Sequence, residues 1–428
     1  MVEPVVLPRA EHTISRRDID PDALKVLYRL RQFNYAAYLV GGSVRDLLLG
    51  RKPKDFDIAT SAHPYQVKRL FRNCWIIGRR FRLAHVKFGT KVIEVATFRR
   101  QVPAGTEEEA AGAPPVPPVP VETAGTAPHD HLIHHDNTFG TPEEDAFRRD
   151  FTVNAIFYDI ATYSIIDYVG GLEDIRARLI RGIGDPDDRV REDPVRMLRA
   201  VALAARLELR IDQPVLDAIA RHRAEIARSA PPRVLEEIYK VLRNGASEPT
   251  FRDLIGTGLL AAIAPEAVDR ISDGFWASLA ALDAYRHRFA STPETLTNPI
   301  LLGTILVPLN LLGPLHARAA ETAPRFGPLP LARRDVDRLR QLLALQAQLR
   351  SPHLSPRARH AVLQRAAFPD ALTWLDIHGP APEIVAAWRT SAADGGIPAQ
   401  APESAAPGRR RRRRGRRRRG PRPTDGQA

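Results

Sequence analysis

Short apolar segments of strand length alternate with helix-like segments over the first hundred residues of the chain. Asp20 and Pro21 form a typical helix start, and Leu24 and Leu27 follow at the spacing of an apolar helix face. Strands are expected at 35–40, 56–59, 75–77, 80–88 and 92–98, and further helices at 43–50 and 63–71. This alternation predicts a compact α+β or α/β unit.

The pattern changes three times beyond residue 100. Residues 103–130 are rich in Pro, Ala, Glu and Gly, cannot bury enough apolar surface to fold, and are expected to form a disordered surface loop. Strand-like sequence returns at 152–159 and 165–169. After Asp193 the periodicity is helical, until a Pro/Ala/Gly-rich and then Arg-rich stretch from about 390 predicts a disordered tail.

The 428 residues carry a formal net charge of +13, which favours a polyanionic partner. Eleven arginines and one aspartate at 409–428 account for ten of these charges, so residues 1–408 carry only +3. Cys74 is the single cysteine, which excludes an intrachain disulfide framework and a cysteine-based zinc site. The N-terminal residues lack an apolar signal segment, and no apolar run reaches the ~18 residues of a membrane helix. We therefore expect a cytoplasmic protein.

A glycine pair followed by two aspartates is the strongest chemical pattern in the chain. Gly41 and Gly42 would let backbone N–H groups approach a triphosphate at a helix start, where Arg45 can neutralise phosphate charge. Asp55 and Asp57, two residues apart on an expected strand, would share one face with Cα atoms roughly 7 Å apart. Two carboxylates this close repel each other unless a cation lies between them, which predicts a Mg²⁺ site.

Glu94 adds a third carboxylate, within the apolar segment 92–97. A carboxylate inside an apolar strand needs a partner, because burying it unpaired is costly. Glu94 is either a third ligand or organiser of the metal site, or the partner of one of the many arginines. The sequence leaves both interpretations open.

Together these motifs resemble the class II branch of the nucleotidyltransferase superfamily, which contains bacterial poly(A) polymerases and CCA-adding enzymes. The likeness extends from about residue 25 to 245. It implies that Asp55 and Asp57 bind the metal and take part in catalysis, and that the glycine pair and Arg45 contact the triphosphate of the nucleotide.

The segment 143–154 resembles the family motif that contacts the ribose. The resemblance implies that Arg149, Asp150 and Asn154 face the sugar and phosphates, with Asp150 among the catalytic carboxylates. An Asp or Asn side chain can hydrogen-bond a 2′-hydroxyl group, which would distinguish ATP from dATP.

Residues 192–199 resemble the family's amino-acid template for the incoming base, which implies nucleotide binding by Glu192, Asp193 and Arg196. The carboxylate of Asp193 and the guanidinium of Arg196 complement the amino donor and ring-nitrogen acceptor that adenine and cytosine share, whereas guanine and uracil reverse this pattern. A helix cap is the alternative role for Asp193. Arg233, in a further family motif, would position Asp193 or pair with a nearby glutamate.

The choice of adenine over cytosine rests on a separate resemblance. Residues 76–86 (Ile-Ile-Gly-Arg-Arg-Phe-Arg-Leu-Ala-His-Val) resemble a signature of the poly(A) polymerase group that CCA-adding relatives lack. It implies template-independent addition of AMP from ATP to RNA 3′ ends, in mRNA processing and transcription, as a mark for RNA decay. A CCA-adding tRNA nucleotidyltransferase and a non-catalytic RNA-binding protein are the alternatives.

The resemblance also implies the architecture: an α+β nucleotidyltransferase palm of the polymerase β type, followed by an all-α neck, body and leg. The expected segments are an N-terminal extension (1–20), the head (21–180), the neck with the base-binding motif (181–245), an RNA-binding body and leg (246–390) and the disordered basic tail (391–428).

Cofactors and partners follow from the same resemblance. Two Mg²⁺ ions, replaceable by Mn²⁺, would be held by Asp55 and Asp57, with Glu94 as a further candidate and ATP as substrate. We expect a monomer without a transmembrane segment that acts on RNA 3′ ends, with RNA-decay proteins as candidate partners.

The arginine runs of the tail suit sequence-independent phosphate binding, with peripheral contact to an anionic membrane as the alternative. The predicted RNA-binding residues are Arg409, Arg410, Arg411, Arg412, Arg413, Arg414, Arg416, Arg417, Arg418 and Arg419. The His/Asp cluster at 129–136 lies beside the expected loop and is interpreted as chance enrichment, not as a metal site.

Overall fold

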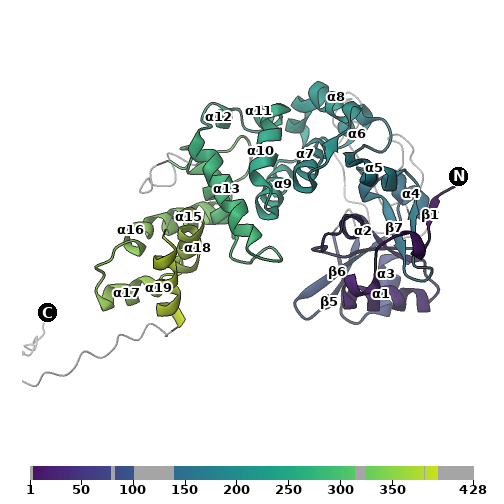
Figure 1. Ribbon diagram of the computed structural model, residues 1–428, viewed down its shortest axis with the longest axis horizontal. Helices are drawn as coiled ribbons and strands as arrows, with labels where there is room; N and C mark the ends of the chain where they lie inside the picture. Colours follow the sequence, from purple (N-terminus) through teal and green to yellow (C-terminus); the bar gives the residue numbers. More distant parts are fainter. Residues whose placement is uncertain (1–2, 79–81, 101–138, 314–323, 380, 394–428) are drawn as a thin grey trace, which may run out of the picture.

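The computed structural model describes residues 3–78, 82–100, 139–313, 324–379 and 381–393. The predicted loop at 103–130, the His/Asp cluster at 129–136 and the ten tail arginines lie outside these residues. Figure 1 shows a curved, elongated molecule with a sheet at one end and helices over the rest. The predicted fold class, an α+β head followed by an all-helical part, is confirmed.

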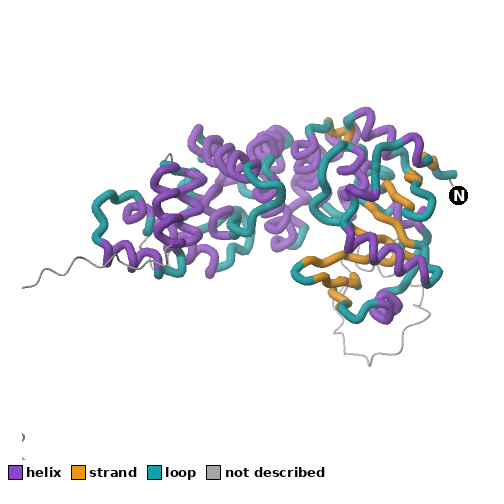
Figure 2. The backbone as a smooth tube through the Cα atoms, turned by 60° about the horizontal axis from the view of Figure 1, so that its bottom comes forward, coloured by secondary structure: helices purple, strands orange, loops and turns teal. Residues whose placement is uncertain are grey.

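An eight-stranded sheet forms the head, with the strand order β1-β8-β7-β2-β3-β6-β5-β4. Neighbouring strands are antiparallel except β3 and β6, which are parallel. The strands are β1 (Val5–Leu7), β2 (Ala37–Val40), β3 (Asp57–Thr60), β4 (Cys74–Ile77), β5 (Leu83–Phe88), β6 (Lys91–Thr97), β7 (Ile156–Asp159) and β8 (Ser164–Asp167). Figure 2 shows these strands gathered at one end of the molecule.

The helices of the head are α1 (Pro21–Gln32), α2 (Gly42–Leu48), α3 (Pro64–Leu70), α4 (Pro142–Phe147) and α5 (Gly171–Ala177). The start of α1 is the predicted one, because Oδ1 of Asp20 accepts hydrogen bonds from the backbone N–H groups of Asp22 (2.9 Å) and Ala23 (3.3 Å). Helices α1 and α3 pack on one face of the sheet: α1 against β2 and β3, and α3 against β4, β5 and β6. Helices α1 and α3 do not cover the opposite face of β4–β6.

Residues 152–154 form a 3₁₀ turn where a strand was predicted to start, and β7 begins after it. Oγ1 of Thr152 donates to Oδ2 of Asp174 (2.6 Å), and Nδ2 of Asn154 donates to Oδ1 of Asp150 (3.1 Å). These side-chain bonds hold the turn in place of strand pairing. The turn keeps Asn154 next to the glycines that start α2.

The remainder of the chain is helical apart from a small parallel pair of strands, β9 (Leu179–Ile180) and β10 (Arg210–Ile211). The helices are α6 (Pro186–Glu192), α7 (Val195–Leu207), α8 (Gln213–His222), α9 (Pro231–Asn244), α10 (Ser247–Gly256), α11 (Leu259–Ile263), α12 (Pro265–Val268), α13 (Asp273–His287), α14 (Asn298–Leu306), α15 (Arg333–Ala344), α16 (Gln346–Leu349), α17 (Pro356–Leu363), α18 (Phe368–His378) and α19 (Pro382–Ala393). Helix α19 thus continues three residues into the predicted tail.

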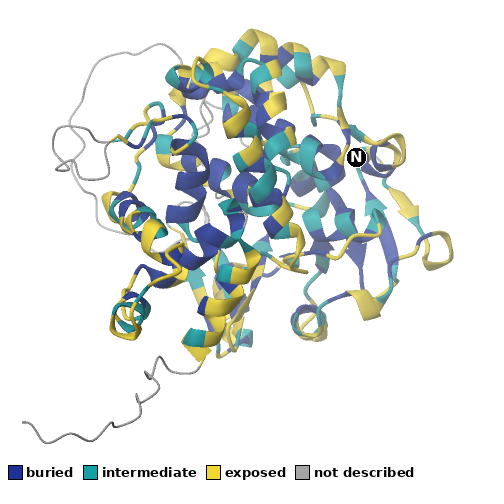
Figure 3. Ribbon diagram, turned by 60° about the vertical axis from the view of Figure 1, so that its left-hand side comes forward, coloured by how far each residue is buried: buried dark blue, intermediate teal, exposed yellow. Residues whose placement is uncertain are grey.

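The main hydrophobic core extends from Ile14 in the head to Trp388 in α19, and a second, smaller cluster includes Val40, Phe98 and Phe157. Figure 3 shows these buried residues lining the inner sides of the helices. Every residue from Pro299 to Leu306 in α14 is buried, as expected for the apolar segment found there in the sequence. Among the described helices, none has the length and apolar character needed to cross a bilayer.

Candidate active site

The turn between β2 and α2 is built on two glycines. Gly41 has φ 70° and ψ −133°, a conformation that L side chains rarely adopt, and a Cβ atom there would lie 3.1 Å from Nη1 of Arg149. A Cβ atom at Gly42 would lie 3.3 Å from Nη2 of Arg45. The glycine pair therefore permits the close approach of two arginines. Its contact with a triphosphate stays a prediction.

Arg45, which is only 4% exposed, is held by protein groups. Its Nε and Nη2 donate to Oδ1 of Asp46 at 2.8 and 2.6 Å, and its Nη1 donates to Oδ1 of Asn154. Oδ1 of Asp46 also lies 3.8 Å from Nη2 of Arg206 on α7. Burial, followed by the charge of Arg45, lowers the pKa of Arg206 to about 10. Arg45 thus fixes Asn154, and it would have to exchange these partners to bind a phosphate.

Asp57, the first residue of β3, lies alongside Glu94 of β6 in the parallel register of the two strands. Burial raises the pKa of Asp57 to about 6; the charges of Glu94 and Asp55 add to this rise, and Arg149 opposes it. A carboxylate in this setting is stabilised in its ionised form by a nearby cation. A cation bound beside Asp57 and Glu94 would therefore stabilise the ionised form of Asp57.

Asp55 lies in the loop before β3, so the prediction that it shares a strand face with Asp57 is wrong. The reason is that β2 ends at Val40, directly opposite Asp57, and offers Asp55 no partner. Its side chain is 74% exposed, and Nζ of Lys54 lies 3.8 Å from its Oδ2. Asp55 is nevertheless close enough for its charge to raise the pKa of Asp57.

The carboxylates of Asp55, Asp57 and Glu94 fit a hard cation. Carboxylate oxygens are typical Mg²⁺ ligands, and one or two of them suffice when substrate phosphates supply further oxygens. Across the described ranges, no three His, Cys, Asp or Glu side chains already form a group that could hold a metal.

Another carboxylate of the head, the buried Asp145, is paired with arginines. Nε of Arg148 donates to its Oδ1 (2.8 Å), and Nη2 of Arg149 donates to its Oδ2 (2.9 Å). Burial acts to raise the pKa of Asp145, but Arg149 and Arg148 outweigh it and the pKa is lowered. Nη1 of Arg149 also donates to the backbone oxygen of Asn154 (3.1 Å). Asp145 thus anchors an arginine of the predicted ribose-contacting motif.

Asp150 is likewise paired. Its Oδ2 lies 2.6 Å from Nη2 of Arg199, and its Oδ1 accepts from Nδ2 of Asn154 (3.1 Å). Burial acts to raise the pKa of Asp150, but the charge of Arg199 and these bonds lower it overall. The structure therefore brings Arg149, Asp150 and Asn154 together. The catalytic role of Asp150 stays a prediction, because its contacts position neighbouring groups.

The predicted base-reading residues lie where α6 passes into α7. Oε2 of Glu192 accepts from Nη1 of Arg189 (2.7 Å) and from Nη1 of Arg196 (3.0 Å). Oδ2 of Asp193 accepts from Nη2 of Arg233 (2.9 Å), which is the contact expected for a positioning arginine. Each member of the Asp193–Arg196 pair thus has a partner of opposite charge that orients it.

Arg189 and Arg199, which were not predicted to have a role, connect the neck to the head. Nη2 of Arg189 donates to the backbone oxygens of Arg148 (2.6 Å) and Arg149 (2.7 Å), while Arg199 pairs with Asp150. Burial, followed by the charge of Arg196, lowers the pKa of Arg189. For Arg199 the available signal was its spacing from Arg196, three residues away on α7, which puts both on one helix face. Arg189 had no such signal.

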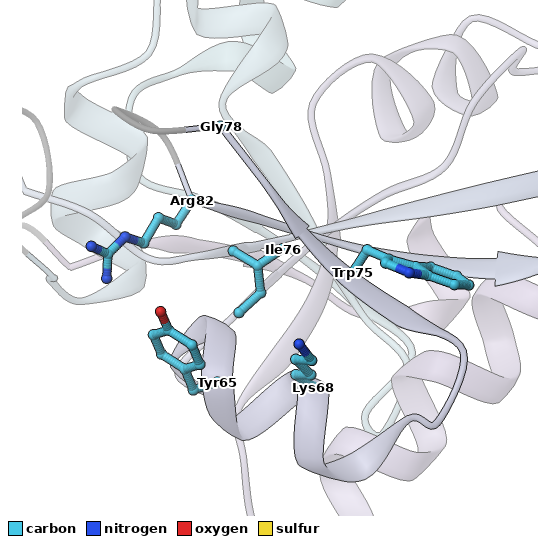
Figure 4. A pocket seen from close by; sticks show the side chains of 6 residues that line it. All are labelled: Tyr65, Lys68, Trp75, Ile76, Gly78 and Arg82. Carbon is cyan, nitrogen blue, oxygen red and sulfur yellow. The ribbon is translucent and has the colours of Figure 1, made fainter.

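The segment predicted to mark adenylating enzymes spans β4 and β5, with residues 79–81 outside the described part. A cavity of about 520 Å³ adjoins it, lined by Tyr65, Lys68, Trp75, Ile76, Gly78 and Arg82. Figure 4 shows Tyr65, Lys68 and Ile76 on one side of β4 and the indole of Trp75 extending away from them. His85 lies opposite Glu94, with 3.6 Å between its Nε2 and Oε1 of Glu94.

Comparison with protein-family models gives two matches. Residues 37–181 match the family described as Poly A polymerase head domain. Residues 208–270, which include α8 to α12, match the one described as Probable RNA and SrmB- binding site of polymerase A. The first match contains the glycine pair, Asp55, Asp57, Glu94 and the segment 143–154.

Curated relatives fall into two groups. Poly(A) polymerase I of Salmonella typhi is 49% identical over 249 residues, which cover 58% of this chain and 51% of the relative. The Escherichia coli O157:H7 enzyme of the same name is 48% identical over 247 residues, 58% of this chain and 50% of the relative. The CCA-adding enzyme of Bacillus velezensis is 33% identical over 239 residues, 56% of this chain and 54% of the relative. The chain thus spans about half the length of these relatives.

Solved structures extend the likeness over most of the chain. The Bacillus stearothermophilus CCA-adding enzyme in complex with CTP aligns with a TM-score of 0.60 at 27% identity, covering 88% of this chain and 83% of that chain. The Thermotoga maritima CCA-adding enzyme complexed with tRNA aligns at 0.52 and 18% identity, covering 91% and 86%. The second likeness concerns the fold alone.

Proposed function

We propose, from the membership of residues 37–181 in the poly A polymerase head-domain family, that this chain adds AMP from ATP to RNA 3′ ends without a template. The observation that carries the proposal is the placement of Asp57 beside Glu94, where burial and like charge raise the pKa of Asp57 to about 6. That setting favours a divalent cation shared with a triphosphate, as nucleotidyl transfer requires.

The preference for adenosine over a CCA sequence is supported by the relatives. Identity is 49% to a poly(A) polymerase I and 33% to a CCA-adding enzyme over similar lengths. The resemblance of residues 76–86 to the poly(A) polymerase signature points the same way. A CCA-adding activity is the alternative, because it would use the same carboxylates and the same base-reading residues.

In the proposed reaction, Asp55, Asp57 and Glu94 would hold Mg²⁺. A bound Mg²⁺ would lower the pKa of the RNA 3′-hydroxyl and stabilise the leaving diphosphate. The chain's own residues orient the reactants. Asn154, fixed by Arg45 and Asp150, would contact the ribose.

The adenine edge would meet Asp193 and Arg196. The carboxylate accepts from the exocyclic amino group, and the guanidinium donates to the ring nitrogen. Arg233 and Glu192 keep these side chains in place through the 2.9 and 3.0 Å contacts. Guanine and uracil would leave both charged groups without a complementary partner, which disfavours them.

The remaining parts of the proposal concern cofactors, partners and location. Two Mg²⁺ ions would serve the site, with Mn²⁺ as a substitute, and the protein would act as a cytoplasmic monomer. Residues 208–270 and the tail arginines are the candidate RNA contacts outside the head. Marking RNA for decay is the expected consequence of adenylation.

The test uses purified full-length protein, Mg²⁺ and an RNA of arbitrary sequence with a free 3′-hydroxyl, with each nucleoside triphosphate supplied separately. We expect long A tracts with ATP and little extension with GTP or UTP. Addition of C, C and A to tRNA followed by arrest would identify the CCA-adding alternative. RNA binding without extension by any nucleotide would identify a non-catalytic RNA-binding protein.

A further inference from the structure

The outer three strands of the sheet, β4, β5 and β6, are covered on one face. On that face, packed by α3, lie the buried side chains of Cys74, Ala84, Val86, Ile93 and Val95. The alternate residues point to the opposite face, where Trp75 is 53%, Ile77 51% and Val92 42% exposed. We call this the open face, defined by Trp75, Ile77, His85, Lys87, Val92 and Glu94.

The open face is continuous with the candidate metal site. Trp75 pairs with His85, and His85 pairs with Glu94, which lies alongside Asp57. These four side chains therefore form one row across β4, β5, β6 and β3. With neighbouring strands about 4.8 Å apart, the row places Trp75 roughly 14 Å from Asp57.

The exposed indole of Trp75 offers a flat aromatic face that suits a nucleobase. Proteins that bind single-stranded nucleic acids without regard to sequence combine exposed aromatic rings with nearby cationic groups. Lys87 lies on the same face as His85, two residues along β5, and is exposed. Lys54 lies at the other end of the row, 3.8 Å from Asp55.

We propose that the open face binds the single-stranded RNA nucleotides just upstream of the 3′ end, with a base stacked on Trp75. This inference rests on the proposed function, since it supplies a track that leads to the metal-binding carboxylates. Lys87 contacts the phosphates of this segment. Stacking is tolerant of sequence, as a polymerase needs when its own product becomes its next substrate.

The opposite side of β4 supplies a matched control. Tyr65 on α3 is 58% exposed, and the guanidinium carbon of Arg82 lies 5.9 Å from the centre of its ring. Tyr65 and Lys68 thus also combine an aromatic ring with cationic groups. They lie around the cavity of Figure 4, which Trp75 also lines, although its indole extends away from Tyr65. Truncating Tyr65 removes an exposed aromatic ring of similar size without touching the open face.

The experiment measures binding of a fluorescein-labelled oligoadenylate to the full chain by anisotropy. High salt suppresses the electrostatic contribution of the arginine tail and leaves stacking. We expect Trp75→Ala to weaken binding about tenfold, within the range for loss of one base–aromatic stack, and Trp75→Phe to stay within about threefold of wild type. Tyr65→Ala should stay within about twofold, and the KM for RNA should follow the same order.

Wild-type affinity of Trp75→Ala, with circular dichroism showing it folded, would overturn the inference. An equal loss of affinity in Tyr65→Ala would overturn it too, because the RNA would then bind beside Tyr65 and not on the open face alone. Because binding is measured without turnover, it can refute RNA binding by the open face independently of the proposed nucleotide addition. A chain that adds no nucleotide but loses affinity in Trp75→Ala would refute the polymerase and keep the RNA-binding face.

Discussion

Two carboxylates of the head, the buried Asp145 and the half-buried Asp57, differ in their partners. Asp145 lies against Arg148 and Arg149, and its pKa is lowered in spite of burial. Asp57 lies beside Glu94 and near Asp55, and its pKa is raised to about 6. The first carboxylate is satisfied by the protein itself. Arg149 only partly offsets the rise in the pKa of Asp57, so a bound cation would stabilise the ionised carboxylate further, which is why we locate the reaction there.

The largest effect is expected from Asp57→Ala. Loss of a metal ligand should lower AMP addition by about three orders of magnitude, because a catalytic metal contributes several kcal/mol to the barrier. Initial rates with saturating ATP and RNA give the comparison, and oligoadenylate binding serves as the control for folding. A variant that retains more than a tenth of the wild-type rate would remove Asp57 from the reaction.

Asp145→Asn should damage stability instead. It leaves Arg148 and Arg149 partly buried without their anion, which costs about 2–4 kcal/mol. Chemical denaturation of this variant should be set beside Asp22→Asn, which breaks the exposed pair with Lys25 and should cost less than about 1 kcal/mol. Equal losses in the two variants would mean that the Asp145 pairs contribute no more than a surface contact.

Asp57→Asn should change stability in the opposite direction. The folded pKa of Asp57, about 6, exceeds its ordinary value of 3.8, so its contribution to stability is full below pH 3.8 and is lost as the pH rises through 6. Without metal at pH 7.5, the variant should gain up to about 2–3 kcal/mol. The gain should vanish near pH 3.8. A loss of stability at pH 7.5 would contradict the account.

Glu94→Gln should have the smallest effect in this series. Burial is the main cause of the raised pKa of Asp57 and Glu94 comes second, so the variant should lower that pKa only in part. NMR titration of the Asp57 carboxyl without metal measures the change directly. An unchanged pKa would separate Glu94 from the site and leave its contact with His85 as its role.

Local patterns made part of this site predictable. The start of α1 at Asp20 and Pro21, the glycines before α2 and the position of Asp57 follow from capping, backbone freedom and alternation within a few residues. The strand containing Asp57 was predicted to start at residue 56, one residue early, since the partner strand ends at Val40 opposite Asp57. The first residue of β3 depends on where its partner strand β2 ends, and the sequence of the β3 segment does not contain that information.

Long-range contacts were out of reach of the sequence. Arg45 was expected to face phosphate, yet it reaches Asn154, 109 positions away, and is buried. Arg189 lies about forty residues from the two backbone oxygens to which it donates. In both cases the partners are too far apart along the chain for their contact to be predicted from residue spacing. The open face around Trp75 emerged only when the register of four strands was known.

The most direct test of the difference between the two carboxylates is a Mg²⁺ titration of thermal stability at pH 7.5, with wild type and Asp57→Asn side by side. A ligand that binds only the folded state at a hundred times its Kd adds about 2.7 kcal/mol. We expect Mg²⁺ with a non-hydrolysable ATP analogue to raise the melting temperature of wild type well above the effect of the analogue alone. Asp57→Asn, more stable at the outset, should gain little from the ion. An equal Mg²⁺-dependent rise in both proteins would contradict the central claim that Asp57 holds the metal.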